Sequence, residues 1–162
     1  MVVTTPPVER AAESNDVVQL VDLVHGVVRS SLHHVHPTLA KEGITMGQFW
    51  AIHTVSSLEA ASLSTVARYL GVSAPTVCAN LDQLEAAGLL RRHRSQRDRR
   101  AVELSLTPRG RKVEARVWEE ITRVMSKAAR GSPPADVAAA VRVFRELGRR
   151  LEPVAPAPRE GP

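Results

Sequence analysis

The sequence predicts a mainly α-helical protein that carries one small two-stranded β-wing. Three observations support this fold class. Apolar residues recur at three- and four-residue steps over most of the chain, which is the period of amphipathic helices. A three-residue break, Gly71-Val72-Ser73, separates two short helical segments and requires them to cross sharply. Alternation of apolar and polar residues occurs beside residues 91–100, a decapeptide with six arginines and one aspartate.

The first predicted element is a long amphipathic helix over 16–35. Its apolar residues form a single stripe that consists of Val17, Leu20, Val21, Val24, Val27, Val28, Leu32 and Val35. Pro37 is expected to end or kink this helix, because proline has no backbone N–H to donate. We assign residues 13–44 to the helix and its connection. Residues 1–12 and 153–162 lack apolar periodicity and are predicted to be disordered tails.

A capping box predicts the start of the second helix, because Thr45 and Gln48 have the spacing at which each side chain bonds the other's backbone N–H. The inward-facing residues of this helix are Phe49, Ile52 and Val55. Two short helices follow over 62–70 and 73–87, each opened by a serine cap, and the core face of the second contains Val77, Leu81 and Leu84. Their tight connection is typical of a helix-turn-helix.

The arginine-rich decapeptide is predicted to be the tip of a β-hairpin. The first strand begins at residues 89–90, and in the second strand Val102, Leu104 and Leu106 alternate with polar residues and share one buried face. A hairpin directly after a helix-turn-helix is the arrangement of a winged helix. The predicted winged helix-turn-helix spans 45–110.

Two more amphipathic helices are predicted after the wing, over 111–152. Thr107-Pro108 opens the first and Ser132-Pro133 the second, since proline is tolerated in a first helical turn. Their apolar faces contain Val113, Val117, Ile121, Val124 and Ala128, then Val137, Val141, Phe144, Leu147 and Leu151. Together with the N-terminal helix they carry more apolar surface than one small winged helix can cover. We therefore predict that these flanking helices form a homodimer.

The charge of the chain favours anionic partners. Its formal net charge is +5 and its pI is about 10.3, which suits nucleic acid or an anionic membrane surface. No apolar run approaches the length of a membrane span, and the N-terminus lacks a secretion signal. The single cysteine, Cys78, cannot form an internal disulfide. We expect a cytoplasmic protein, without metal or cofactor, whose partner is double-stranded DNA and not a membrane.

Residues of three elements are candidates for DNA contact. The helix 73–87 is about 22 Å long and can lie in the major groove, where Thr76 and Asn80 are the candidate base readers. Serines at the start of the preceding helix can bind phosphate, and wing arginines can enter the minor groove. The candidate positions are Ser62, Ser64, Ser73, Ala74, Pro75, Thr76, Val77, Asn80, Arg91, Arg94, Arg97, Asp98, Arg99 and Arg100.

These segments resemble the MarR type of winged-helix transcriptional regulators over roughly 17–151. The wing is the most specific part: Arg97-Asp98-Arg99-Arg100 contains the family's D-x-R signature, and Leu106-Thr107-Pro108-Arg109-Gly110 its Leu-Thr-x-x-Gly helix start. The resemblance implies that Asp98 pairs with Arg100 to brace the wing and that Arg97 or Arg99 enters the minor groove. It also implies an obligate homodimer on a near-palindromic operator.

The same resemblance implies a small-molecule effector in a cleft between the DNA-binding lobe and the dimerisation helices. The candidate lining residues are His25, Arg29, His33, Trp50, His53 and Trp118. Other interpretations stay open. Both tryptophans suit a hydrophobic core. The first-helix face that carries His25, Arg29, His33 and His36 suits a surface or dimer contact better than a metal site.

The leading hypothesis is a homodimeric, sequence-specific transcriptional regulator, a repressor that a small-molecule effector releases from DNA. The alternative is an architectural or weakly specific DNA-binding protein without an effector, which the high pI favours. An enzyme that uses His25, His33 or Cys78 is disfavoured, because no nucleophile elbow, phosphate-binding loop or metal motif accompanies them. The position of Cys78 in the second helix of the turn also suggests an oxidation sensor, for which the sequence argues weakly.

Overall fold

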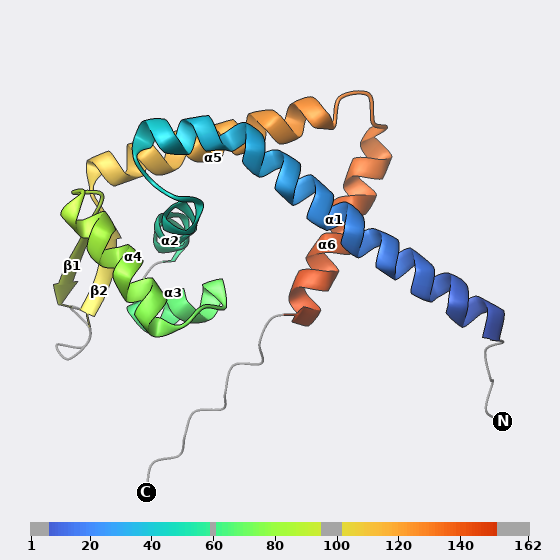
Figure 1. Ribbon diagram of the computed structural model, residues 1–162, viewed down its shortest axis with the longest axis horizontal. Coiled ribbons are helices and arrows are strands. Elements are labelled where there is room, and N and C mark those ends of the chain that lie inside the picture. The colour runs from blue at the N-terminus through green and yellow to red at the C-terminus, as the bar shows by residue number, and fades with distance from the viewer. Residues whose placement is uncertain (1–6, 59–60, 95–101, 152–162) are drawn as a thin grey trace, which may run out of the picture. The chain divides into compact units, whose positions relative to one another are not determined.

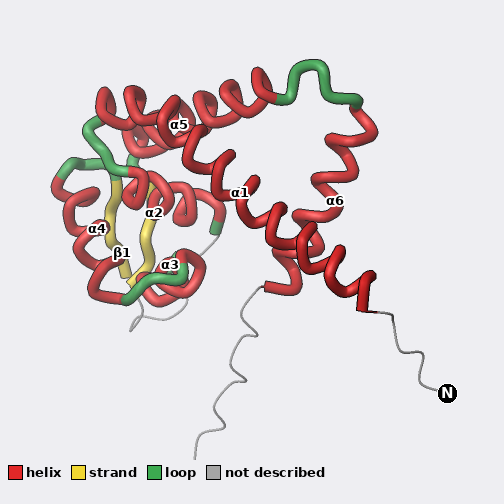
Figure 2. Tube along the Cα trace, turned by 45° about the vertical axis from the view of Figure 1, so that its right-hand side comes forward, coloured by secondary structure: helices red, strands yellow, loops and turns green. Residues whose placement is uncertain are grey.

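The computed structural model describes residues 7–58, 61–94 and 102–151 (Figure 1). In order, its elements are α1 (Pro7–Glu42), α2 (Met46–Ser57), α3 (Leu63–Leu70), α4 (Ala74–Ala86), β1 (Leu90–Arg94), β2 (Val102–Leu106), α5 (Pro108–Ala128) and α6 (Pro134–Leu151). The two strands form an antiparallel hairpin (Figure 2). The fold class, mainly helical with a small β-wing after a helix-turn-helix, is confirmed. The chain divides into two compact units, residues 1–125 and 126–162.

The hydrophobic core of the first unit lies among α2, α3, α4 and the hairpin. α2 is its most enclosed helix, and Phe49, Ala51 and Ile52 have no exposed surface. α5 contributes Val113 and Val117, and the last turns of α1 contribute two more. The predicted inward faces of α2 and α4 are confirmed, since all six residues are buried: Phe49, Ile52, Val55, Val77, Leu81 and Leu84.

Side-chain caps set the helix starts, as the sequence predicts. Thr45 Oγ1 accepts a hydrogen bond from the Gln48 backbone N–H at 3.2 Å, and Gln48 Oε1 accepts one from the Thr45 N–H at 2.8 Å. Ser62 and Ser73 cap α3 and α4 with their hydroxyl oxygens. Between these helices Gly71 has a φ of +64°. That conformation strains any residue with a Cβ, so glycine allows the chain to turn within three residues.

The first helix is longer than the sequence predicts. α1 begins at Pro7, so residues 7–12 are helical although a tail is predicted there. Pro37 lies inside α1, so of the two expectations for this residue, that the helix ends there is wrong and that the helix is kinked there stays a prediction. Proline leaves the carbonyl of His33 without its helical donor. Because both residues are exposed, water can bond that carbonyl and the interruption is tolerated.

The hairpin pairs Leu90 with Leu106 and Arg94 with Val102. Its base is buried, but Val102 is 50% exposed, so its expected place on the buried face is wrong. The reason is the register, which puts Val102 opposite Arg94 at the end of the hairpin that leaves the core. A further segment joins this sheet, because the Ala61 carbonyl accepts a hydrogen bond from the Leu104 N–H at 2.8 Å.

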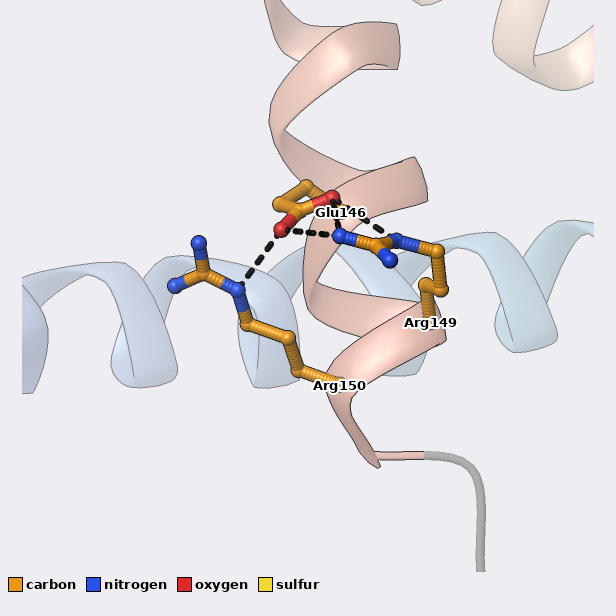
Figure 3. Close-up of polar contacts among 3 residues, drawn as sticks. All are labelled: Glu146, Arg149 and Arg150. Atoms are coloured by element: carbon orange, nitrogen blue, oxygen red, sulfur yellow. Dashed lines mark hydrogen bonds and ion pairs between the residues drawn. The ribbon is translucent and has the colours of Figure 1, made fainter.

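The second unit contains the end of α5 and the helix α6. α6 contributes no buried residue. On its polar side Glu146 binds two arginines, with N–O distances of 2.8 Å to Arg149 and 2.7 Å to Arg150 (Figure 3). Such exposed pairs stabilise a helix by roughly 0.3–0.5 kcal/mol each. The rest of the predicted tails, residues 1–6 and 153–162, lies outside the described residues.

Within the part of the chain that the structure describes, no helix is long and apolar enough to cross a membrane.

Candidate nucleic-acid interface

α4 has one face in the core and an open first turn. Its buried face consists of Val77, Leu81 and Leu84. The exposed positions at its start are Ser73, Ala74, Pro75 and Thr76. In a helix-turn-helix this is the turn that approaches base edges.

The expectation that Val77 contacts DNA is wrong. Its side chain has no exposed surface and belongs to the hydrophobic core. The helical period already contained the signal, because Val77, Leu81 and Leu84 are spaced four and three residues apart and share one face.

The two candidate base readers have different surroundings. Thr76 is exposed, and its Oγ1 lies 2.8 Å from the Oγ of Ser73. Asn80 is half-buried and its amide lies beside the first turn of α2, since a Cβ added to Gly47 would be 3.7 Å from Asn80 Nδ2. Base reading by these residues stays a prediction.

The serines at the start of α3 form a small hydroxyl network. Ser62 Oγ lies 3.0 Å from Ser64 Oγ and 2.8 Å from Thr65 Oγ1, and it accepts from the Thr65 backbone N–H at 3.2 Å. Ser64 is exposed and Ser62 is half-buried. Ser64 is therefore the freer of the two for a phosphate contact, which stays a prediction.

The wing arginines divide into two groups along β1. Arg91 and Arg94 are exposed, as a DNA contact requires, whereas Arg92 is partly enclosed. The remaining candidates, Arg97, Asp98, Arg99 and Arg100, lie outside the described residues. Their expected minor-groove contact and Asp98–Arg100 ion pair stay predictions.

Sequence reasoning missed the role of Arg92. Its Nη2 lies 2.6 Å from Asp82 Oδ1 and its Nη1 lies 2.8 Å from Glu85 Oε2, so both acidic side chains of α4 pair with it. The Cys78 thiol lies 3.8 Å from the other Asp82 oxygen. Asp82 and Glu85 stand three residues apart on the helix and so lie on neighbouring turns. That spacing was the signal in the sequence that one basic side chain could pair with both acids.

The junction of the wing with α5 is tightly built. Thr107 Oγ1 donates to the Gly88 carbonyl at 2.8 Å and accepts from the Gly110 N–H at 3.0 Å, which caps α5 as predicted. Arg109 Nη1 donates to the Ala87 carbonyl at 3.0 Å. Together these bonds fix the end of α4 to the start of α5.

Comparison with known proteins agrees with this geometry. Residues 42–101, which include the helix-turn-helix and the first wing strand, match the model of the MarR family. This part of the chain is therefore similar to the MarR family. The resemblance carried by the wing and cap motifs is therefore confirmed. Among curated proteins, none matches the chain.

Solved structures extend the MarR-type fold over most of the chain. The transcriptional regulator BldR from Sulfolobus solfataricus is 25% identical, with a TM-score of 0.70 over 85% of this chain and 97% of BldR. A MarR family protein from Bacillus stearothermophilus is 18% identical, with a TM-score of 0.73 over 85% and 96% of the two chains. BpsR from Bordetella bronchiseptica, whose DNA binding is regulated by 6-hydroxynicotinic acid, is 24% identical, with a TM-score of 0.65 over 80% and 98%.

Beside the MarR-type winged helix, three of the six expected effector-site residues come together. The ring of His53 on α2 stacks on Trp118 of α5, with centroids 4.4 Å apart and planes at 15°. Phe49 and Trp50 each lie 5.7 Å from the same imidazole. His53 Nδ1 lies 2.8 Å from Glu114 Oε1. Glu114 precedes Trp118 by one helical turn, and the sequence reasoning missed it.

Trp50 and Trp118 are 40% and 43% exposed, so neither is a fully buried core residue. Each tryptophan contacts the ring of His53 and keeps part of its own surface exposed.

The other three expected effector residues lie on α1. Arg29 and His33 line a shallow cavity of about 300 Å³ together with Ser30 and His34. Among the described contacts, the side chain of His25 joins neither this cavity nor the aromatic cluster. The structure therefore divides the predicted effector residues between two places.

Proposed function

We propose that this MarR-type protein is a transcriptional regulator that binds double-stranded DNA sequence-specifically. The observation that carries the proposal is the open first turn of α4 next to a wing strand that exposes Arg91 and Arg94. The helix offers small and polar side chains to base edges in the major groove. The arginines offer charge to the phosphate backbone, which contributes affinity without selecting sequence.

We propose further that it acts as a homodimer on a near-palindromic operator. Large apolar residues are exposed along both flanking helices: Val17, Val18, Val21, Leu23, Val27, Val28 and Leu32 on α1, and Val137, Val141, Val143, Phe144 and Leu151 on α6. Apolar surface on this scale usually marks a protein interface, because burial removes it from water. A two-fold dimer would present two copies of α4 to half-sites roughly 10 base pairs apart.

Selection of bound duplexes from a random-sequence library tests both parts. We expect an enriched palindrome with that half-site spacing, and a selected duplex that outcompetes random DNA by about a thousandfold or more at physiological salt. Equal competition would contradict the regulator and support the alternative, an architectural DNA-binding protein, which the net charge of +5 favours.

The proposed regulator is a repressor, and a small aromatic acid releases it from DNA. The supporting observation is the half-exposed cluster of Trp50, His53 and Trp118, which offers ring faces for stacking. The acid that regulates BpsR is a ligand of this chemical class. Because the cluster joins α2 of the winged helix to α5, a ring inserted there would move one helix against the other.

Tryptophan fluorescence tests the effector site directly, since both tryptophans of the chain belong to the cluster. We expect 6-hydroxynicotinic acid to quench the fluorescence and to weaken binding to the selected duplex, and we expect His53→Ala to reduce both effects. Tyr69→Phe, a change at an exposed aromatic residue of α3, is the control. Unchanged fluorescence and DNA affinity at millimolar acid would contradict an aromatic-acid effector.

A further inference from the structure

One arginine of the wing is directed at α4, the recognition helix of the proposed DNA interface. Arg92 on β1 places Nη2 2.6 Å from Asp82 Oδ1 and Nη1 2.8 Å from Glu85 Oε2. Its backbone N–H also donates to Glu85 Oε1 at 3.2 Å. Glu85 therefore holds the strand by main chain and side chain at once, while Asp82 holds the outer end of the guanidinium.

In these ion pairs the positive charge of Arg92 is balanced by two carboxylates of the protein itself. Its side chain is 28% exposed, whereas Arg91 and Arg94 on the same strand are exposed. The close contact with Asp82 and the charges of the nearby carboxylates raise the pKa of Arg92, a guanidinium that is always protonated in proteins.

Without Arg92, the two carboxylates of α4 would oppose DNA binding. They stand three residues apart on one helix and repel each other, and they lie toward its C-terminal end, where the helix dipole disfavours negative charge. On a helix that enters a groove lined by phosphates, such charges also repel the ligand. An arginine between them relieves all three effects.

The contact point lies midway along the wing. Arg92 lies opposite Leu104 of β2, and the Leu104 N–H bonds the Ala61 carbonyl, so this level of the hairpin is also held by the segment before α3. Leu90 anchors the base of the wing in the core. β1 is therefore held at two points, Leu90 and Arg92. Two points fix the direction of the strand, whereas a single contact at its base would not.

We propose that Arg92 is a positioning residue: it ties β1 to α4 through Asp82 and Glu85, sets the wing against the recognition helix, and makes no phosphate contact of its own. This inference rests on the proposed DNA-binding function. Its distinctive consequence is that specific binding depends on two acidic side chains of the recognition helix.

Neutralisation of the carboxylates gives the sharpest test. The probe is the duplex selected by the wild-type protein, and the variant is Asp82→Asn/Glu85→Gln, which removes two negative charges. We expect its affinity to fall about tenfold, although general electrostatics predicts tighter binding. Glu119→Gln, at an exposed acid of α5, is the control and should not weaken binding. Equal or tighter binding by the Asp82/Glu85 variant would overturn the proposal.

Arg92→Lys separates a fork that spans two carboxylates from a simple phosphate contact. A lysine keeps the positive charge and can still bind a phosphate in place of an arginine. It has only one side-chain nitrogen, so it cannot contact two carboxylates on neighbouring turns at once. We expect Arg92→Lys to weaken binding nearly as much as Arg92→Ala, with the salt slope unchanged in both. Restoration by lysine, with a slope reduced by about 0.9 in Arg92→Ala, would assign Arg92 to a phosphate instead.

Unfolding without DNA distinguishes failure of this inference from failure of the proposed function. In a double-mutant cycle of Arg92→Ala and Glu85→Ala, we expect the losses of unfolding free energy to be non-additive. If the losses in the variants are additive while the wild-type protein binds the selected duplex specifically, only the positioning role of Arg92 is overturned. A wild-type protein that binds every duplex equally would overturn the proposed function.

Discussion

At the scale of single residues, Gly110 decides how closely two elements approach. A Cβ at this position would overlap the carbonyl oxygen of Leu89 and lie 2.9 Å from its carbonyl carbon. The first turn of α5 therefore packs directly on the backbone that enters β1. Thr107 fixes the same junction from the other side, because its hydroxyl bonds both Gly88 and Gly110. The Leu-Thr-x-x-Gly spacing thus has a steric and a hydrogen-bonding reason.

Gly110→Ala should strongly destabilise the fold, because the added methyl group meets rigid backbone. We expect a loss of about 3 kcal/mol in the free energy of unfolding, at the upper end of overpacking effects, measured by urea denaturation. Gly47→Ala is the matched control in the same lobe, since its nearest neighbours would lie at an ordinary 3.7 Å. A Gly110→Ala protein as stable as the Gly47→Ala protein would contradict the close approach.

At the scale of elements, the capping box of α2 also links helices. Besides bonding the Thr45 backbone, the Gln48 side chain donates from Nε2 to Gln83 Oε1 on α4 at 2.6 Å. Gln48 is 8% exposed, so this amide bridge is well shielded from water. The same residue therefore starts α2 and holds it against the recognition helix.

Thr45→Ala should remove the cap of α2 and cost about 1 kcal/mol of unfolding free energy. The expected thermal shift is a lower Tm than in Ser56→Ala, which changes an exposed serine of the same helix. Equal Tm values for the two variants would show that the hydrogen bonds of the capping box contribute nothing measurable.

An ion pair on α5 gives a pH prediction. Arg123 hydrogen-bonds Glu120 at 2.6 and 2.7 Å and lowers the pKa of its carboxyl group. Because that pKa is lower in the folded than in the unfolded state, the pair stabilises above the unfolded value, and the effect is lost as pH falls through the folded value. Titration of Glu120 by NMR should show a higher pKa in Arg123→Ala. An unchanged pKa would refute this pairing in solution.

At the scale of the whole molecule, the main feature is apolar surface that the folds of a single chain do not bury. α6 contributes no residue to the core and carries Val137, Val141 and Phe144 at helical spacing on one side. The proposed homodimer accounts for this surface, because a second copy offers the same apolar face.

Phe144→Asp should convert the dimer to a monomer, because a carboxylate cannot be buried in an apolar interface without a partner. Light scattering after size exclusion would measure the mass, and circular dichroism would check that the helices persist. Ala138→Asp introduces the same charge away from the apolar stripe and should leave the dimer intact. A Phe144→Asp dimer as tight as wild type would place the interface elsewhere.

The sequence by itself determined the order and type of the elements, because their signals are local. Thr45 with Gln48, the turn at Gly71 and the Thr107-Pro108 start each act within a few residues, and all three appear in the structure as predicted. The length of α1, in contrast, could not be predicted from such local signals. Pro37 is tolerated because its surroundings are open to water, which depends on what packs nearby.

Only the tertiary structure decided which side chains meet across elements. Arg92 is, in sequence, one of six similar arginines, yet the register of β1 places it against the carboxylates of α4. Packing of α2 on α5 likewise brings His53 onto Trp118. Such contacts depend on how helices and strands are placed to within an ångström, whereas caps and periods depend only on neighbours along the chain. For that reason the winged helix could be predicted from sequence, and the contacts of Arg92 with Asp82 and Glu85 could not.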